Sequence, residues 1–221
     1  MFSKLNKKSF NFKKTLTSKY KPCVIEQLDD KRFVVGTYEL VDTELKKKFS
    51  NEDLERINQR AGSIEILDES FTISEVYESF LGGVFALKVI NKHIVVAHAN
   101  GVLALYSYDP IHLFCSFKTL SNILTTVDCL TFQDHLYYYT AGETGILSCI
   151  PESFVSDDET LKEVSILDEP IWTVNTNLTN PEGISFVLIG SEDAKWRLFD
   201  HWCVKFIYFC IQVHLSNFFF F

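Results

Sequence analysis

An internal repeat is the feature of this sequence that most constrains its fold. Gly101, Gly145 and Ala194 fall in register when three segments are aligned by their turns, and a weaker match occurs at Gly62 before SIEILDE. In each segment a short apolar run is followed by a small polar turn and a second, alternating run: VVAHANGVLALYSYD (95–109), YYTAGETGILSCIPE (138–152) and LIGSEDAKWRLFD (188–200). The turns recur roughly every 40 to 50 residues, and a period of that length with several short strands is typical of propeller blades rather than of helical repeats.

Each repeat is expected to contain more than its central hairpin. The hairpins are predicted because small turn residues lie between runs that alternate with period two. A strand is expected before each hairpin, at 84–90, 125–133 and 171–178, and outer strands at 71–79, 112–120 and 161–168. The composition also favours strands, because aromatic side chains suit a pleated surface: the chain has 20 Phe and 9 Tyr but only 1 Met and 9 Gly. The sequence therefore predicts an all-β fold, an incomplete β-propeller of about four blades.

Three parts are expected along the chain. Residues 1–21 carry seven lysines and no acid, and we expect a solvated basic segment there, since transit peptides are rich in Arg. Residues 22–200 are predicted to form the partial propeller. The repeat pattern stops after Asp200, and the apolar tail 201–221 is expected to lie outside the propeller. The tail is long enough to span a membrane, but Lys205 and several polar residues interrupt it, so we expect a premature end rather than a membrane anchor.

Charge and cysteine content exclude several kinds of partner. The formal net charge is -8 although the first segment is basic, so the folded part is strongly acidic and no nucleic-acid partner is expected. The six cysteines form no C-x-x-C pair and have no histidine at the spacing of zinc ligands. We therefore expect no metal, no cofactor, and reduced, buried thiols in a cytoplasmic protein.

Several stretches resemble one family. Phe199-Asp200 occupies the place of the Trp-Asp dipeptide of a WD repeat, where the aromatic ring packs between blades. Four further stretches carry a resemblance: SKYKPCVIEQL (18–28), RFVVGTYEL (32–40), RAGSIEILDE (60–69), and EPIWTVNTNL (169–178) followed by FVLIGSEDAKWRLFD (186–200). A charged insertion, DTELKKKFSNEDLERINQ (42–59), separates the second stretch from the third. Through these stretches the chain resembles the WD-repeat diphthine methyl ester hydrolases over about residues 18–200, although it has GSED and FD where that family has GGDD and WD.

The resemblance implies a function. Members of this family hydrolyse the methyl ester of methylated diphthine, a modified histidine on translation elongation factor 2, before the final amidation to diphthamide. Elongation factor 2 would then be the protein substrate. The resemblance also implies about three further blades, so we expect a chain that ends at residue 221 to be poorly soluble and inactive.

A non-catalytic WD-repeat scaffold for protein–protein interaction is the alternative, because a fold alone does not define a function. A third possibility is an adaptor attached to a membrane through the tail 201–221, and it requires that the tail is a true part of the protein sequence.

Candidate site residues lie at the predicted hairpins and strand ends. No G-x-S-x-G elbow or H-E-x-x-H helix is present, so a serine triad is not supported, and propellers usually bind through loops at one mouth. His98 could act as a base, or its ring could bond a backbone carbonyl at the turn. Glu143, Glu192 and Asp193 occupy equivalent hairpins and could bind the trimethylammonium group of diphthine, or be solvated turn acids. Trp172 could form one wall of an aromatic cage for that cation, or pack between blades.

Overall fold

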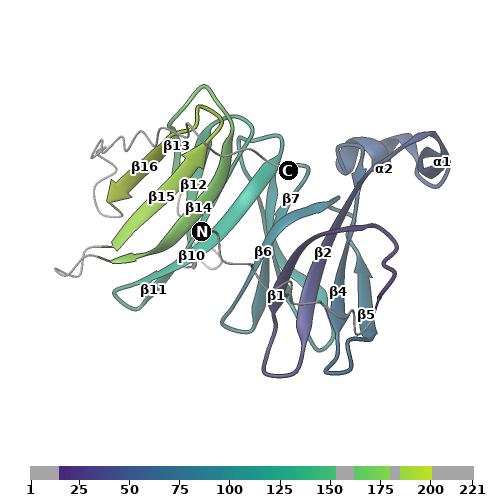
Figure 1. Cartoon of the computed structure of the whole chain (residues 1–221). Helices are drawn as coiled ribbons and strands as arrows, with labels where there is room; N and C mark the ends of the chain where they lie inside the picture. Colours follow the sequence, from purple (N-terminus) through teal and green to yellow (C-terminus); the bar gives the residue numbers. More distant parts are fainter. Residues whose placement is uncertain (1–14, 153–161, 180–184, 201–221) are drawn as a thin grey trace, which may run out of the picture.

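The chain folds into antiparallel β-sheets. A computed structural model describes residues 15–152, 162–179 and 185–200, and in these ranges four sheets follow one another along the chain (Figure 1). The predicted all-β class is therefore confirmed. The predicted tail 201–221 and residues 1–14 of the basic segment lie outside the described residues.

Within each sheet the main strands pair in the order in which they occur in the sequence. Sheet 1 contains β1 (Lys21–Gln27), β2 (Phe33–Leu40), β4 (Ser63–Leu67) and β5 (Ile73–Glu78), with β3 (Arg60–Ala61) paired to β2. Sheet 2 contains β6 (Val84–Ile90), β7 (His93–His98), β8 (Val102–Ser107) and β9 (His112–Lys118). Sheet 3 contains β10 (Leu124–Phe132), β11 (His135–Gly142), β12 (Ile146–Pro151) and β13 (Lys162–Ser165). Sheet 4 contains β14 (Ile171–Thr179), β15 (Ser185–Ser191) and β16 (Trp196–Asp200). The strands predicted before and after the hairpins are thus present.

The predicted turn register is confirmed for three of its four positions. Gly101, Gly145 and Ala194 all adopt the left-handed conformation, with φ of 78°, 69° and 58°. Gly62 differs, because it lies between β3 and β4 rather than in a hairpin turn. A Cβ atom there would meet the Thr37 carbonyl oxygen at 2.2 Å, so close backbone packing explains this glycine.

The core lies between consecutive sheets. Three clusters of buried apolar side chains join sheet 1 to sheet 2, sheet 2 to sheet 3, and sheet 3 to sheet 4. Strand β7 serves two of them: Ile94 and Val96 belong to the first cluster and Val95 and Ala97 to the second. Because alternate side chains point to opposite faces, a strand covered on both sides reads as a continuous apolar run. Phe199 packs against the third cluster, whose members come from sheets 3 and 4.

The first strands of the four sheets lie next to one another. Strand β6 contacts β1 and β10, and β10 contacts β14. A buried bond reinforces the last of these contacts, because the Asp128 carboxylate accepts hydrogen bonds from the Thr176 backbone N–H (2.8 Å) and hydroxyl (3.1 Å). The stacking of the sheets is therefore fixed by polar as well as apolar contacts.

The charged insertion forms two short helices, α1 (Thr43–Lys46) and α2 (Asn51–Arg56), beyond the end of sheet 1 that is uppermost in Figure 1. Ser50 and Asp53 form a capping box at the start of α2. Leu54 is buried, and Ile57 packs with Tyr20 in a small apolar cluster that attaches the helix to the sheet. The insertion is therefore a folded part of sheet 1.

The cysteines match the expectation only in part. None of the four described cysteines forms a disulfide: Cys129 is buried, and Cys115 and Cys149 are half-buried. Cys23 is exposed, contrary to the prediction of buried thiols, because it lies on β1, whose side chains alternate between half-buried and exposed positions.

Candidate functional site

All the predicted site residues lie at one end of the sheets. This end, uppermost in Figure 1, carries the β7–β8, β11–β12 and β15–β16 turns, the start of β14 and the two helices. The turns of successive sheets are brought together there because each sheet stacks on the next in the same orientation. We call it the helix end of the molecule.

The helix end contains an open polar cavity of about 660 Å³. Charged side chains of both signs line it: Glu55, Arg56, Arg60, Lys118 and Glu143. Three side-chain amides add donors and acceptors: Asn58, Asn100 and Asn122. Sheets 1, 2 and 3 all contribute, so the cavity exists only because these sheets are stacked.

The segment after α2 closes one side of the cavity. The side-chain amide of Asn58 donates a hydrogen bond to the Ala99 carbonyl (3.0 Å), and that of Asn100 donates to the Arg56 carbonyl (2.9 Å). Asn58 and Gln59 both have positive φ, 50° and 53°, which non-glycine residues seldom adopt. Reciprocal bonds between sheet 1 and the β7–β8 turn of sheet 2 thus hold this strained segment in place.

His98 lies at the end of β7 and is fully buried. Its Nδ1 is 3.2 Å from the Gly82 carbonyl oxygen and its Nε2 is 2.9 Å from the Tyr106 hydroxyl. Since a carbonyl can only accept, Nδ1–H donates to Gly82 and Nε2 accepts from Tyr106. Burial lowers the pKa of the imidazole to about 4, so the ring is neutral at physiological pH. The placement favours the structural role of a ring bonded to a carbonyl, and a catalytic role for His98 stays a prediction that its burial argues against.

Glu143 is the predicted residue that reaches the cavity. It is half-buried at the β11–β12 turn, where its backbone N–H donates to the Ile123 carbonyl (3.2 Å). Its carboxylate makes no hydrogen bond or ion pair with any described residue. A half-buried carboxylate in this position is suited to hold a cation.

Trp172 and Glu192 are brought together. The indole N–H of Trp172 donates a hydrogen bond to the Glu192 carboxylate, and the Glu192 backbone N–H donates to the Pro170 carbonyl (3.0 Å). Trp172 is 53% exposed, more than a ring packed between two sheets would be. The pair combines an aromatic face with a negative charge, the two elements that attract a quaternary ammonium group.

Asp193 has a different role from its neighbour. Its carboxylate accepts hydrogen bonds from the Arg197 guanidinium (2.5 Å and 3.1 Å) and the Ser191 hydroxyl (2.5 Å). The Arg197 contact holds the pKa of this carboxyl well below its usual range. Asp193 therefore closes the β15–β16 hairpin, and its charge is already paired.

No sequence pattern predicts that the positively charged side chains of the cavity lie together. Arg60 belongs to the RAGSIEILDE stretch, and Lys118 ends an outer strand, but neither position indicates a cavity. Arg56 lies in a run of mixed charge that resembles a solvated helix face. The abrupt change from strand pattern to charged insertion at 42–59 is the one feature that marks this end of the molecule.

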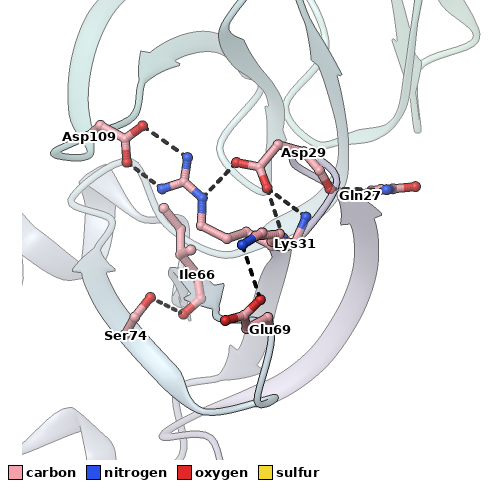
Figure 2. Close-up of polar contacts among 8 residues, drawn as sticks. Gln27, Asp29, Lys31, Ile66, Glu69, Ser74 and Asp109 are labelled. Atoms are coloured by element: carbon pink, nitrogen blue, oxygen red, sulfur yellow. Dashed lines mark hydrogen bonds and ion pairs between the residues drawn. The ribbon is translucent and has the colours of Figure 1, made fainter.

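The opposite end of the sheets has paired charges. Arg32 donates from Nε to Asp29 (2.7 Å) and from its terminal nitrogens to Asp109, which links the β1–β2 turn of sheet 1 to the β8–β9 turn of sheet 2. Lys31 and Glu69 form an ion pair there at 3.4 Å, as Figure 2 shows. The Arg32–Asp109 contact joins two sheets, whereas the Lys31–Glu69 pair joins two turns of sheet 1, and both are structural in character.

Further properties of the described ranges bear on the possible classes of function. No helix there is long and apolar enough to cross a membrane. No group of three or more His, Cys, Asp or Glu side chains in those same ranges is arranged to hold a metal ion. A scan against protein-family models gives no match, and neither does a search of curated proteins.

Proposed function

We propose that the four sheets are consecutive blades of a WD-repeat-type β-propeller. The first strand of each sheet contacts the first strand of the next, and the core clusters lie between sheets, as they do when blades are arranged around a common axis. In this arrangement the helix end is one mouth of the propeller. Propellers bind their ligands mostly through the loops of a mouth.

Within that class, we propose that the protein is a methylesterase that acts on methylated diphthine of elongation factor 2 in the cytoplasm. The observation that carries this proposal is that the stretches resembling the family contact one another. The Thr37 hydroxyl of RFVVGTYEL lies 2.8 Å from the Ser63 hydroxyl of RAGSIEILDE, in a buried network. Trp172 of EPIWTVNTNL bonds Glu192 of the following stretch.

The chemistry also suits the helix end. In ester hydrolysis a water oxygen attacks the carbonyl carbon and the bond to the methoxy oxygen breaks. One proton of the water leaves with the methanol, and the other is released as the carboxylate forms. The reaction needs a base near the water and donors for the developing oxyanion. The cavity has carboxylates, cations and amide donors around one volume.

The test is the state of elongation factor 2 in cells that lack the gene for this chain. Mass spectrometry of the modified peptide should find the methyl ester retained, and restoring the gene should remove it. Methanol release from the retained ester by the encoded protein would complete the assignment. Normal formation of diphthamide in the deleted cells would refute it.

A non-catalytic scaffold is the second candidate, favoured by exposed apolar side chains at the helix end. Leu40 is 56% exposed, Phe80 41% and Leu120 66%, and all three lie at or just beyond strand ends there. Large exposed apolar side chains on the loops of one mouth are typical of protein interfaces. Unchanged elongation factor 2 in the deleted cells would favour this role.

A further inference from the structure

We propose that the polar cavity binds a zwitterionic side chain, with its carboxylate group against Arg60 and its quaternary ammonium group against Glu143. The identification of this ligand as the diphthine side chain rests on the proposed function. The zwitterionic character itself rests on the charges that line the cavity.

Arg60 is the cation with an unused donor. Its terminal nitrogen donates to the Asn58 carbonyl (2.9 Å), which fixes the orientation of the guanidinium. Its Nε is buried and has no hydrogen-bond partner, the one such side-chain atom in the described part of the chain. The guanidinium also lines the cavity and has no carboxylate partner among the described residues, so its charge can pair with a bound carboxylate there.

The other two cations of the cavity already have partners. Arg56 pairs with Asp53 and lies over the Phe80 ring, 5.8 Å from its centroid. The Lys118 ammonium donates to the Asn100 carbonyl. Both add positive potential to the cavity, but Arg60 offers a guanidinium that no described carboxylate pairs with.

Glu143 provides the opposite charge. A quaternary ammonium has no N–H, so it is held by negative charge and by close contact rather than by hydrogen bonds. The Glu143 carboxylate is half-buried and makes no bond with a described residue, so no internal partner has to be displaced. A ligand with both charges would neutralise Arg60 and Glu143 together.

Glycine betaine, a small molecule with one trimethylammonium and one carboxylate group, is the probe for this site. Binding to the purified protein is followed by NMR titration, with tetramethylammonium and acetate as single-charge probes. Arg60→Gln and Glu143→Gln should each weaken betaine binding about tenfold, the effect expected when a charged partner is lost. Arg60→Gln should weaken acetate but not tetramethylammonium, and Glu143→Gln should do the reverse.

The matched controls are Lys31→Gln and Glu69→Gln, which remove the same charges from the ion pair at the opposite end (Figure 2). Both should bind all three probes like the parent. Arg60→Lys, which keeps the charge but lacks the planar guanidinium, should bind acetate with intermediate affinity, and it serves as the second variant if Arg60→Gln does not fold. Equal betaine affinity in the parent and both cavity variants, or equal losses in the controls, would overturn the proposal.

The outcome is separate from that of the proposed function, because betaine binding needs no ester hydrolysis. If betaine binding depends on Arg60 and Glu143 but cells lacking the gene form diphthamide normally, the binding site is supported and the methylesterase function is rejected. A retained methyl ester in those cells, with betaine binding insensitive to Arg60 and Glu143, would keep the methylesterase and reject this site.

Discussion

Replacing Gly101 by alanine should destabilise the protein strongly. Gly101 has φ of 78°, a conformation that costs a residue with a Cβ atom about 1–2 kcal/mol. The added Cβ would also lie 1.8 Å from the Ser121 carbonyl oxygen, whereas an ordinary carbon–oxygen contact is about 3.3 Å or more. Ser121 cannot move freely, because its hydroxyl bonds Thr144 (2.7 Å) and its backbone N–H bonds the Thr119 hydroxyl (3.2 Å).

We therefore expect Gly101→Ala to lower the free energy of unfolding by about 3–4 kcal/mol, the sum of the backbone strain and the displacement of this loop. The matched variant is Ala194→Gly, at the equivalent turn of sheet 4 with φ of 58°, which should be neutral or stabilising by about 0.5 kcal/mol. Urea unfolding followed by circular dichroism measures both. A loss below about 1 kcal/mol for Gly101→Ala would show that the loop relaxes and that this reasoning is wrong.

Three further predictions follow from single contacts. Because burial lowers the pKa of His98 from its ordinary 6.5 to about 4, the unfolded chain takes up a proton that the folded chain does not. The free energy of unfolding should therefore fall as the pH drops from about 6.5 toward 4, and urea titrations should show a smaller fall between pH 6.5 and 5 in His98→Gln. Asp128→Ala should cost about 1–3 kcal/mol in the same assay, because it leaves the buried Thr176 backbone N–H without its acceptor while the Thr176 hydroxyl keeps the Cys129 carbonyl (2.8 Å), and Asp128→Asn should cost less. Glu192→Gln should change the fluorescence of Trp172 without unfolding the protein, because it removes the charge that the indole N–H contacts; unchanged emission would contradict the contact.

The sheets were predictable because their signals are local. Gly101 and Gly145 mark turns in which a positive φ is required, and the flanking runs alternate with period two, so the pairing of β7 with β8 and of β11 with β12 follows from neighbouring residues. Ala194 was found only through the repeat, since alanine does not itself signal that conformation.

The cavity was not predictable, because its walls come from distant parts of the chain. Asn58 meets Ala99, and neither residue type indicates the contact. His98 shows a second limit: in a strand buried on both faces, alternation no longer tells which side chains reach solvent. The continuous apolar run before His98 is the signal of such a strand, and it indicates burial of the histidine as well.

The stacking of the sheets has a consequence for selectivity. Arg60 belongs to sheet 1, Lys118 to sheet 2 and Glu143 to sheet 3, so the spacing between the charges that line the cavity depends on how closely neighbouring sheets pack. That packing is set by side chains in the interior, such as Tyr138 between sheets 2 and 3. Changes in the volume of such residues would tune which ligands fit without altering any group that touches them, so the interior of this protein is as much a determinant of recognition as its surface.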